Sequence, residues 1–249
     1  MALYVSVRAL PSQLFDTMLL LLLCCLLAYV CVRACVAGRS QPSGHGMMAS
    51  PNGRSYQGEF LLGKRNGFGR MNYANGDYYL GNWESDKPNG FGLMQSIVEG
   101  VYDGWWANGL RDGPYGTMLY KNGNFYRGSW KKGQPNGKGV FCSTEGGVVR
   151  YEGQWASGQF NGKGKLLYAT GDTYEGQFKD DTPHGAGVHA AANSVLYEGK
   201  WQDGVRHGKA TLGVGPSRWT APTKNGIMYD KDGRSFLVTI ELPTFHLAL

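Results

Sequence analysis

A phrase of about 23 residues recurs seven times in the chain and constrains its fold more than any other feature. Each copy has Tyr, then Gly two residues later, then Trp or Phe two residues after that, followed by further regularly placed Gly residues. The copies begin at Tyr56, Tyr79, Tyr102, Tyr126, Tyr151, Tyr174 and Tyr197. A repeat of this length is typical of a solenoid, in which each unit buries its apolar face against the next unit.

Within each copy the residue types alternate with a period of two, which indicates β-strands. In the first copy Tyr56, Gly58 and Phe60 share one face of a strand, and Gln57 and Glu59 point to the other. A Gly between two rings leaves room for a ring to lie flat over the backbone. The alternation resumes after a turn, so each copy predicts one β-hairpin.

Two kinds of tight turn are predicted. Inside a copy, Pro-Asn-Gly at 88–90 and 135–137 and Pro-His-Gly at 183–185 combine a fixed φ with residues that tolerate left-handed geometry. Between copies, Asn-Gly-Asp at 75–77 is typical of a hairpin turn. We therefore predict an all-β fold, an elongated single-layer antiparallel ribbon of seven hairpins, preceded by an N-terminal hydrophobic helix.

The repeated phrase resembles the MORN repeat (membrane occupation and recognition nexus) over residues 56–214. The chain departs from the pattern where Asp86 and Asp181 replace Gly, and where residues 113–116 include one extra residue that we interpret as a bulge. Proteins with similar repeats serve as assembly modules at membranes, cytoskeletal structures and cilia or flagella. Lipid binding is claimed for some of them, and the enzymes among them have a separate catalytic domain.

The segments that flank the repeats differ from them in composition. Along the chain we predict an N-terminal segment at 1–17, an apolar helix at 18–37, a flexible linker at 38–55, seven repeats at 56–214 and a C-terminal cap at 215–249. The cap is predicted to contain a strand at 235–242.

The apolar run at 18–37 is long enough to cross a membrane. We interpret it as a retained transmembrane anchor. The alternatives are a cleaved signal peptide, which would leave the repeats secreted or lumenal, and a mispredicted start or buried helix. Arg33 and Arg39 follow most of the run and only Arg8 precedes it, so the positive-inside rule predicts a single-pass protein with cytosolic repeats.

Two cysteines lie near the predicted cytosolic boundary of this helix. Cys31 and Cys35 are candidates for S-palmitoylation, which is common at juxtamembrane cysteines. The alternative is that both are simply small apolar residues in lipid.

The sequence predicts no catalytic residue, no metal site, no cofactor and no enzyme. His184 and His207 occupy a turn position that holds Asn or Asp in the other copies, where tolerance of positive φ explains them. His189 falls at an apolar position, and we expect a partly exposed ring there rather than a ligand. The net charge of +6 is not clustered as nucleic-acid binding requires, so no nucleic-acid partner is predicted.

The aromatic residues are the first candidates for a binding site. We expect the rings mainly to pack the ribbon, and we consider as partner-binding candidates Tyr102, Trp105, Trp106, Trp130 and Trp155. Trp105 is distinct because the other copies have a polar residue at its position. It is either an exposed hot spot for a partner or a filler for the neighbouring bulge.

A series of lysines is the second candidate, as a site for anionic lipid. Its members are Lys131, Lys132, Lys138, Lys163, Lys165 and Lys209. Lys138, Lys163 and Lys209 share one repeat position, so we expect them to align along one edge. Such a row could meet anionic headgroups, or it could be a set of ordinary solvated lysines that prevent edge-to-edge aggregation.

These observations lead to a functional hypothesis and one alternative. The hypothesis is a non-enzymatic, membrane-tethered scaffold that docks a protein partner or self-associates. The alternative is a membrane-proximal module that binds anionic phospholipid or phosphoinositide.

Overall fold

The computed structural model of the chain describes residues 41–193, 195–214, 216–224, 227–229 and 235–236. Regular structure in these residues is entirely β, and the chain divides into two compact units, Met1–Lys87 and Pro88–Leu249. The helix predicted at 18–37, with Cys31 and Cys35, lies outside the described residues. The part of the chain that is described includes no helix with the length and hydropathy needed to cross a membrane.

The first unit consists of four antiparallel strands. These are β1 (Gly44–Ala49), β2 (Ser55–Leu61), β3 (Lys64–Asn72) and β4 (Tyr78–Glu84), and each pairs with the next. The position of β1 differs from the sequence prediction, which placed a flexible linker there. β1 satisfies main-chain groups along the edge of β2, from Gly44 opposite Phe60 to Ala49 opposite Ser55.

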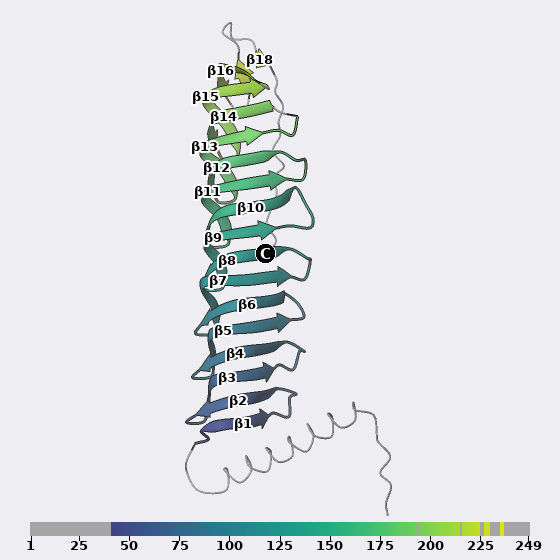
Figure 1. The fold of residues 1–249 in the computed structure, drawn as a ribbon, viewed down its shortest axis with the longest axis vertical. Coiled ribbons are helices and arrows are strands. Elements are labelled where there is room, and N and C mark those ends of the chain that lie inside the picture. Colours follow the sequence, from purple (N-terminus) through teal and green to yellow (C-terminus); the bar gives the residue numbers. More distant parts are fainter. Residues whose placement is uncertain (1–40, 194, 215, 225–226, 230–234, 237–249) are drawn as a thin grey trace, which may run out of the picture. The chain divides into compact units, whose positions relative to one another are not determined.

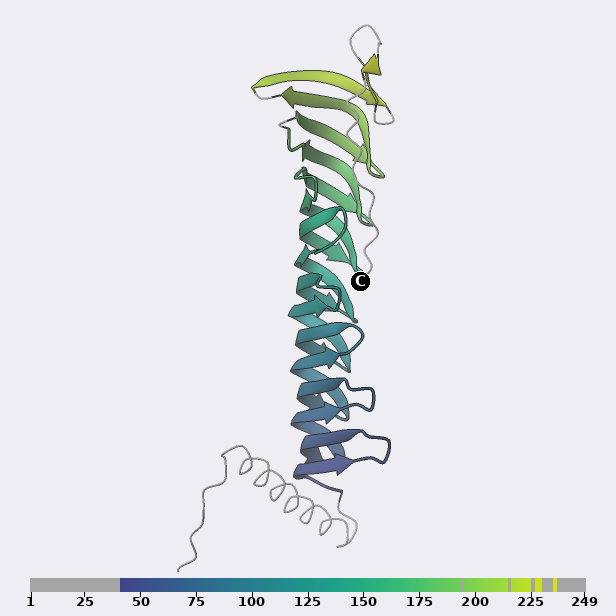
Figure 2. The ribbon, with the colours of Figure 1, turned by 90° about the vertical axis from the view of Figure 1, so that its right-hand side faces the viewer.

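The second unit is an antiparallel sheet whose strands follow one another in chain order (Figures 1 and 2). Its repeat strands are β5 (Lys87–Ser96), β6 (Gly100–Ala107), β7 (Leu110–Tyr120), β8 (Phe125–Lys131), β9 (Gln134–Cys142), β10 (Val148–Ala156), β11 (Gln159–Tyr168), β12 (Thr173–Lys179), β13 (Thr182–Ala190), β14 (Val195–Gln202) and β15 (Val205–Val214). Each of them pairs with the next. The prediction of antiparallel β-hairpins is confirmed.

The sheet continues beyond the last repeat. The strand β16 (Ser217–Lys224) pairs with β15 along its length, from Ser217 opposite Val214 to Thr223 opposite Gly208. Two short strands follow, β17 (Ile227–Tyr229) and β18 (Ser235–Phe236). Of the cap strand predicted at 235–242, the structure describes only β18.

The turns inside the copies are not where the Pro and Gly residues predicted them. Pro135 and Gly137 lie inside β9, and the turn before it is made by Lys132 (φ 50°) and Gly133 (φ 87°). Two consecutive residues with positive φ are typical of a type I′ turn, whose twist matches the flanking strands. A positive φ was expected at His184, but it occurs at the next residue, Gly185 (φ 69°). A positive φ was likewise expected at His207, and it occurs at Gly208 (φ 73°).

Other local predictions are confirmed. The turn between copies at 75–77 is formed with Gly76 at φ 91°. Asp86 and Asp181, which replace Gly, adopt positive φ values of 70° and 67°. The extra residue at 113–116 produces a register shift between β7 and β8, as expected for a bulge.

Candidate interaction surfaces

Within each unit, the sheet has an inner face that carries the repeated rings and an opposite, outer face. On the inner face every repeat Tyr is buried, and its hydroxyl donates a hydrogen bond of 2.8–3.0 Å to the main-chain carbonyl three residues on. Burial raises the pKa of Tyr56 to about 12, and it also raises the pKa of Tyr102, Tyr126, Tyr151, Tyr174 and Tyr197. These hydroxyls therefore remain protonated donors at any physiological pH.

The Trp residues join one copy to the next. Five copies have Trp four residues after the repeat Tyr. In each of them the Trp Nε1–H donates a hydrogen bond of 2.9–3.3 Å to a Gly carbonyl of the preceding copy. Tyr and Trp rings of successive copies also meet edge to face, as at Tyr102 and Trp130, with centroids 5.1 Å apart. The rings thus form a continuous ladder within each unit.

The ladder depends on the Gly residues beneath the rings. A Cβ added to Gly104 would lie 2.7 Å from the Tyr102 hydroxyl oxygen, and one added to Gly153 would lie 2.6 Å from the Gly164 Cα. Real Cβ contacts at these distances do not occur without movement of the backbone or the ring. The predicted close approach of ring and backbone is confirmed.

One repeat position covers the ladder from the inner side. Arg111 lies over the rings of Tyr102 and Trp130, at 5.4 and 5.5 Å from their centroids, and forms an ion pair with Glu99. Phe160 fills the equivalent position in its copy and stacks on Tyr151 at 3.7 Å. This position was not predicted as a site, although its residues across the copies are all cationic, proline or aromatic: Arg65, Pro88, Arg111, Pro135, Phe160, Pro183 and Arg206.

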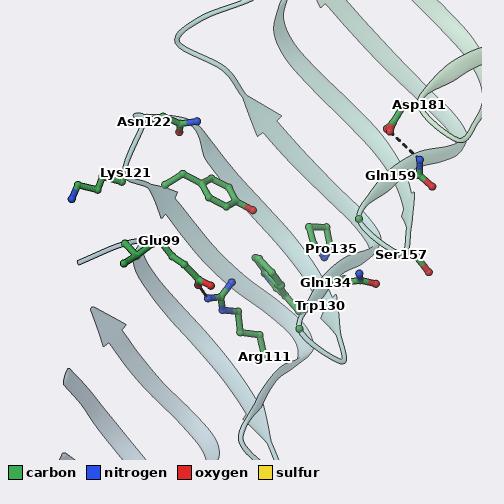
Figure 3. A pocket seen from close by; sticks show the side chains of 14 residues that line it. Glu99, Arg111, Lys121, Asn122, Trp130, Gln134, Pro135, Ser157, Gln159 and Asp181 are labelled. Atoms are coloured by element: carbon green, nitrogen blue, oxygen red, sulfur yellow. Dashed lines mark hydrogen bonds and ion pairs between the residues drawn. The ribbon is translucent and has the colours of Figure 1, made fainter. Parts of the chain in front are cut away.

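A groove of about 980 Å³ opens beside Arg111 in the second unit (Figure 3). Trp130 and Pro135 form part of its wall, Glu99 and Arg111 lie together on one side, and Asp181 bonds to Gln159 at 3.3 Å on the other. The groove is mixed in polarity and presents several hydrogen-bonding side chains. Within the described residues no group of three His, Cys, Asp or Glu side chains could hold a metal ion.

The structure separates Trp105 from the other aromatic candidates. Tyr102, Trp106, Trp130 and Trp155 belong to the buried ladder, and only Trp130 borders the groove. Trp105 points to the outer face and is 44% exposed, against 8% for its neighbour Trp106. It also lies over the bulge, because a Cβ added to Gly113 would collide with the Trp105 side chain. Trp105 is therefore exposed and also packs against the bulge, and its role as a hot spot stays a prediction.

Trp105 belongs to a group of exposed apolar side chains on β5–β7, which we call the apolar patch. Its members and their exposed fractions are Phe91 (45%), Trp105 (44%), Tyr115 (43%) and Leu119 (49%). Phe91 and Trp105 lie opposite each other in register, with ring centroids 6.2 Å apart. A contiguous exposed apolar patch is a candidate interaction site in a folded protein.

The six lysine candidates do not form one surface. Lys131 and Lys132 lie at the turn between β8 and β9, and Lys165 forms an ion pair with Glu175 at 3.6 Å. Lys138, Lys163 and Lys209 lie on strands β9, β11 and β15, so the row that they share crosses the outer face and not an edge. Their alignment along an edge was therefore a wrong expectation, because the register position belongs to the middle of a strand.

Two of these lysines border a hollow of about 520 Å³, which we call the lysine hollow. Lys138 and Lys163 line it together with Val140, Glu152 and Gln154. Lys138 is in register with Gln154, whose Oε1 accepts the backbone N–H of Lys163 at 2.8 Å. Ion pairs between described residues do not involve Lys138 or Lys163.

His189 is completely buried, whereas the sequence analysis expected a partly exposed ring. It replaces an apolar residue of the core, lies 6.3 Å from the Trp201 ring by centroids, and approaches Asp172 at 3.3 Å. Burial lowers the pKa of the imidazole, the positive charge of Arg206 lowers it further, and Asp172 opposes both effects. His184, which was predicted at a turn, lies within β13, and its Nδ1 is 3.6 Å from Asp203 Oδ1.

The MORN repeat family matches seven segments of the chain, at residues 56–78, 79–96, 102–125, 126–148, 151–173, 174–193 and 197–212. These segments cover more than half of the sequence. The chain is a MORN-repeat protein. The resemblance inferred from the Tyr-Gly-Trp phrases is thereby confirmed, and a repeat scaffold for binding is the family-level description of this chain.

Two further comparisons add little to this assignment. No curated protein matches the chain. Among solved structures it is similar to the SAS-4 (dCPAP) TCP domain of Drosophila melanogaster, which was solved in complex with a proline-rich motif of Ana2 (dSTIL). The match has 11% sequence identity and a TM-score of 0.39, and it covers 76% of this chain and 96% of the other.

Proposed function

We propose that this MORN-repeat protein is a non-enzymatic scaffold, tethered to a membrane by residues 18–37, whose cytosolic repeats dock a protein partner on the apolar patch. The observation that carries the proposal is the exposure of Phe91, Trp105, Tyr115 and Leu119 on the outer face, where Phe91 and Trp105 lie side by side. Aromatic side chains at the centre of an exposed patch supply most of the binding energy in protein interfaces.

The docking proposal is tested by comparing two variants at the same repeat position. Trp105→Ala removes the largest ring of the patch, and Gln154→Ala changes the equivalent residue beside the lysine hollow. Proteins captured by the full-length tagged chain are quantified by mass spectrometry. We expect Trp105→Ala to lose at least one partner that Gln154→Ala keeps, by about thirtyfold or more for a hot spot. Identical partner lists for the two variants would overturn the proposal.

The tethering and the cytosolic location are tested by protease protection. In intact cells, a C-terminal tag on the full chain should resist added protease and should become sensitive once the membrane is permeabilised. Digestion of the repeats in intact cells would contradict the cytosolic location, and recovery of the whole chain in the soluble fraction would contradict the tether.

A second candidate function, binding of anionic phospholipid, is favoured by the lysine hollow. Lys138 on β9 and Lys163 on β11 lie two strands apart, which separates their backbones by about 10 Å, so their ammonium groups could contact one or two phosphates. Full-length protein is reconstituted in neutral vesicles and mixed with anionic vesicles over a salt series. We expect vesicle association at low salt that Lys138→Glu with Lys163→Glu abolishes and Lys131→Glu with Lys132→Glu preserves. Association that neither pair of changes affects would eliminate the hollow as the lipid site.

A further inference from the structure

A row of five side chains crosses the outer face of β5–β9 in register. Leu93 lies opposite Asp103, Asp103 opposite Thr117, Thr117 opposite Arg127, and Arg127 opposite Val140. The residue types of the row are therefore apolar, acidic, polar, basic and apolar. Reversing the row about Thr117 exchanges Leu93 with Val140, which are both apolar, and Asp103 with Arg127, which have opposite charges.

Neither of the two charged residues of this row belongs to an ion pair within the part of the chain that the structure describes. Asp103 and Arg127 are both exposed. The Arg127 guanidinium lies over the Tyr115 ring at 5.3 Å, which keeps it beside the apolar patch. Further along the same row, by contrast, Lys165 is paired with Glu175.

We propose that the apolar patch binds a second copy of this chain, face to face, about a two-fold axis that runs along β7. This inference rests on the proposed function and names the partner. Rotation about such an axis makes the strand order of the second copy run opposite to that of the first. Each row of side chains then lies against the same row of the other copy. It therefore places Asp103 of each copy against Arg127 of the other, and Leu93 against Val140.

The neighbouring rows fit the same axis. On one side of the charged row, Val101, Leu119 and Phe125 lie in register, so Leu119 meets its own equivalent and Val101 meets Phe125 of the second copy. On the other side, Trp105 on β6 faces Ser129 on β8, a small side chain that leaves room for the indole. An axis perpendicular to the strands would instead place Asp103 against Asp103, which like-charge repulsion disfavours.

The size of the contact predicts a weak dimer. Five strands spaced about 4.8 Å apart and five residues rising about 3.3 Å each span about 24 by 17 Å. This is about 400 Å² per copy, roughly half of a standard stable interface. Such a dimer dissociates readily in dilute solution and forms when copies are concentrated on one membrane.

Charge exchange in the full-length protein tests the proposal. Two differently tagged copies are co-expressed, cross-linked in the membrane and co-precipitated. Asp103→Arg alone and Arg127→Asp alone each create two like-charge contacts per dimer, so each should lower self-capture by about tenfold or more. An Asp103→Arg copy with an Arg127→Asp copy restores both opposite-charge contacts, so their mutual capture should return to the wild-type level. Glu198→Arg, on the same row at β14 and outside the contact, should have no effect.

The outcomes separate this inference from the docking proposal. Restoration by the mixed pair supports the dimer and also shows that both variants are folded. Self-capture that neither single change reduces, or that the mixed pair does not restore, overturns the dimer. If the dimer fails while Trp105→Ala still loses a different protein, the docking proposal stands without this inference.

Discussion

Two regions of the outer face share one backbone design and differ in what they present. The apolar patch on β5–β7 and the lysine hollow on β9–β11 lie over the same ladder of Tyr, Gly and Trp. The repeat position of Phe91 is occupied by Lys138 and Lys163 in later copies, and that of Trp105 by Gln154. The comparison teaches that inner positions determine the fold, while outer positions are free to diverge between copies.

The largest effect should be the same in both regions, because it concerns the shared core. Gly104→Ala lies beneath the apolar patch, and Gly153→Ala beneath the lysine hollow. Each added methyl group forces a ring or strand to move, so we expect each to lower the free energy of unfolding by about 3 kcal/mol. Chemical denaturation of the full chain in detergent, followed by Trp fluorescence, measures this. A normal midpoint for either variant would show that the two regions do not share one core.

The next effect, on partner capture, should differ between the two regions. Phe91→Lys with Trp105→Gln gives the apolar patch the residue types of the lysine hollow. Removal of two exposed rings should weaken partner capture by about 2 kcal/mol or more and change the free energy of unfolding by less than about 0.5 kcal/mol. The reciprocal pair, Lys138→Phe with Gln154→Trp, is the matched control. Equal partner capture by both double variants would mean that the outer residues do not decide binding.

A smaller effect, dependent on pH, should be confined to the later copies. The pKa of His189 is lowered by burial, so the unfolded chain takes up a proton that the folded chain does not. Stability should therefore be complete above the ordinary histidine pKa of about 6.5 and fall as the pH drops below it. His189→Leu, which restores the apolar residue found in neighbouring copies, should remove this part of the acid sensitivity. Unfolding midpoints of the wild type and His189→Leu are measured at pH 7.5 and 5.5. The same difference between the two pH values in both proteins would contradict the prediction.

The smallest effect concerns a surface ion pair on β11 and β12, beside the lysine hollow. Lys165 and Glu175 are both largely exposed, so water and salt screen their attraction. Lys165→Ala should change the free energy of unfolding by less than about 1 kcal/mol. A larger loss in the same denaturation assay would show that the outer charges stabilise the fold, and that the two regions differ in stability as well as in binding.

The fold could be predicted from the sequence where residue types repeat. Tyr, Gly and Trp at alternate positions identified strands, and Asn75–Asp77 identified a turn, because both signals are local. The turn before β9 was misplaced because Pro135 and Gly137 resemble turn residues, whereas the chain turns at Lys132 and Gly133. β1 was missed because its sequence lacks the alternation, and it is a strand only through its pairing with β2.

The candidate surfaces could be predicted only in part. Trp105 was predicted because it breaks the pattern of its own position, whereas Phe91 was not predicted, although it shares the repeat position of the candidates Lys138 and Lys163. Which side of the sheet each residue faces depends on the bulges, so the pairing of Phe91 with Trp105 and the separation of Lys131 from Lys138 required the structure. The burial of His189 likewise depends on its long-range neighbours.

Oxidation of the seven Trp residues tests the central claim most directly, because adjacent residues 105 and 106 are assigned to opposite faces. The full chain is treated briefly with a Trp-selective oxidant, and each site is quantified by tandem mass spectrometry. We predict rapid oxidation of Trp105 and Trp219 and protection of Trp83, Trp106, Trp130, Trp155 and Trp201. Equal oxidation of Trp105 and Trp106, or rapid oxidation along the ladder, would contradict the account.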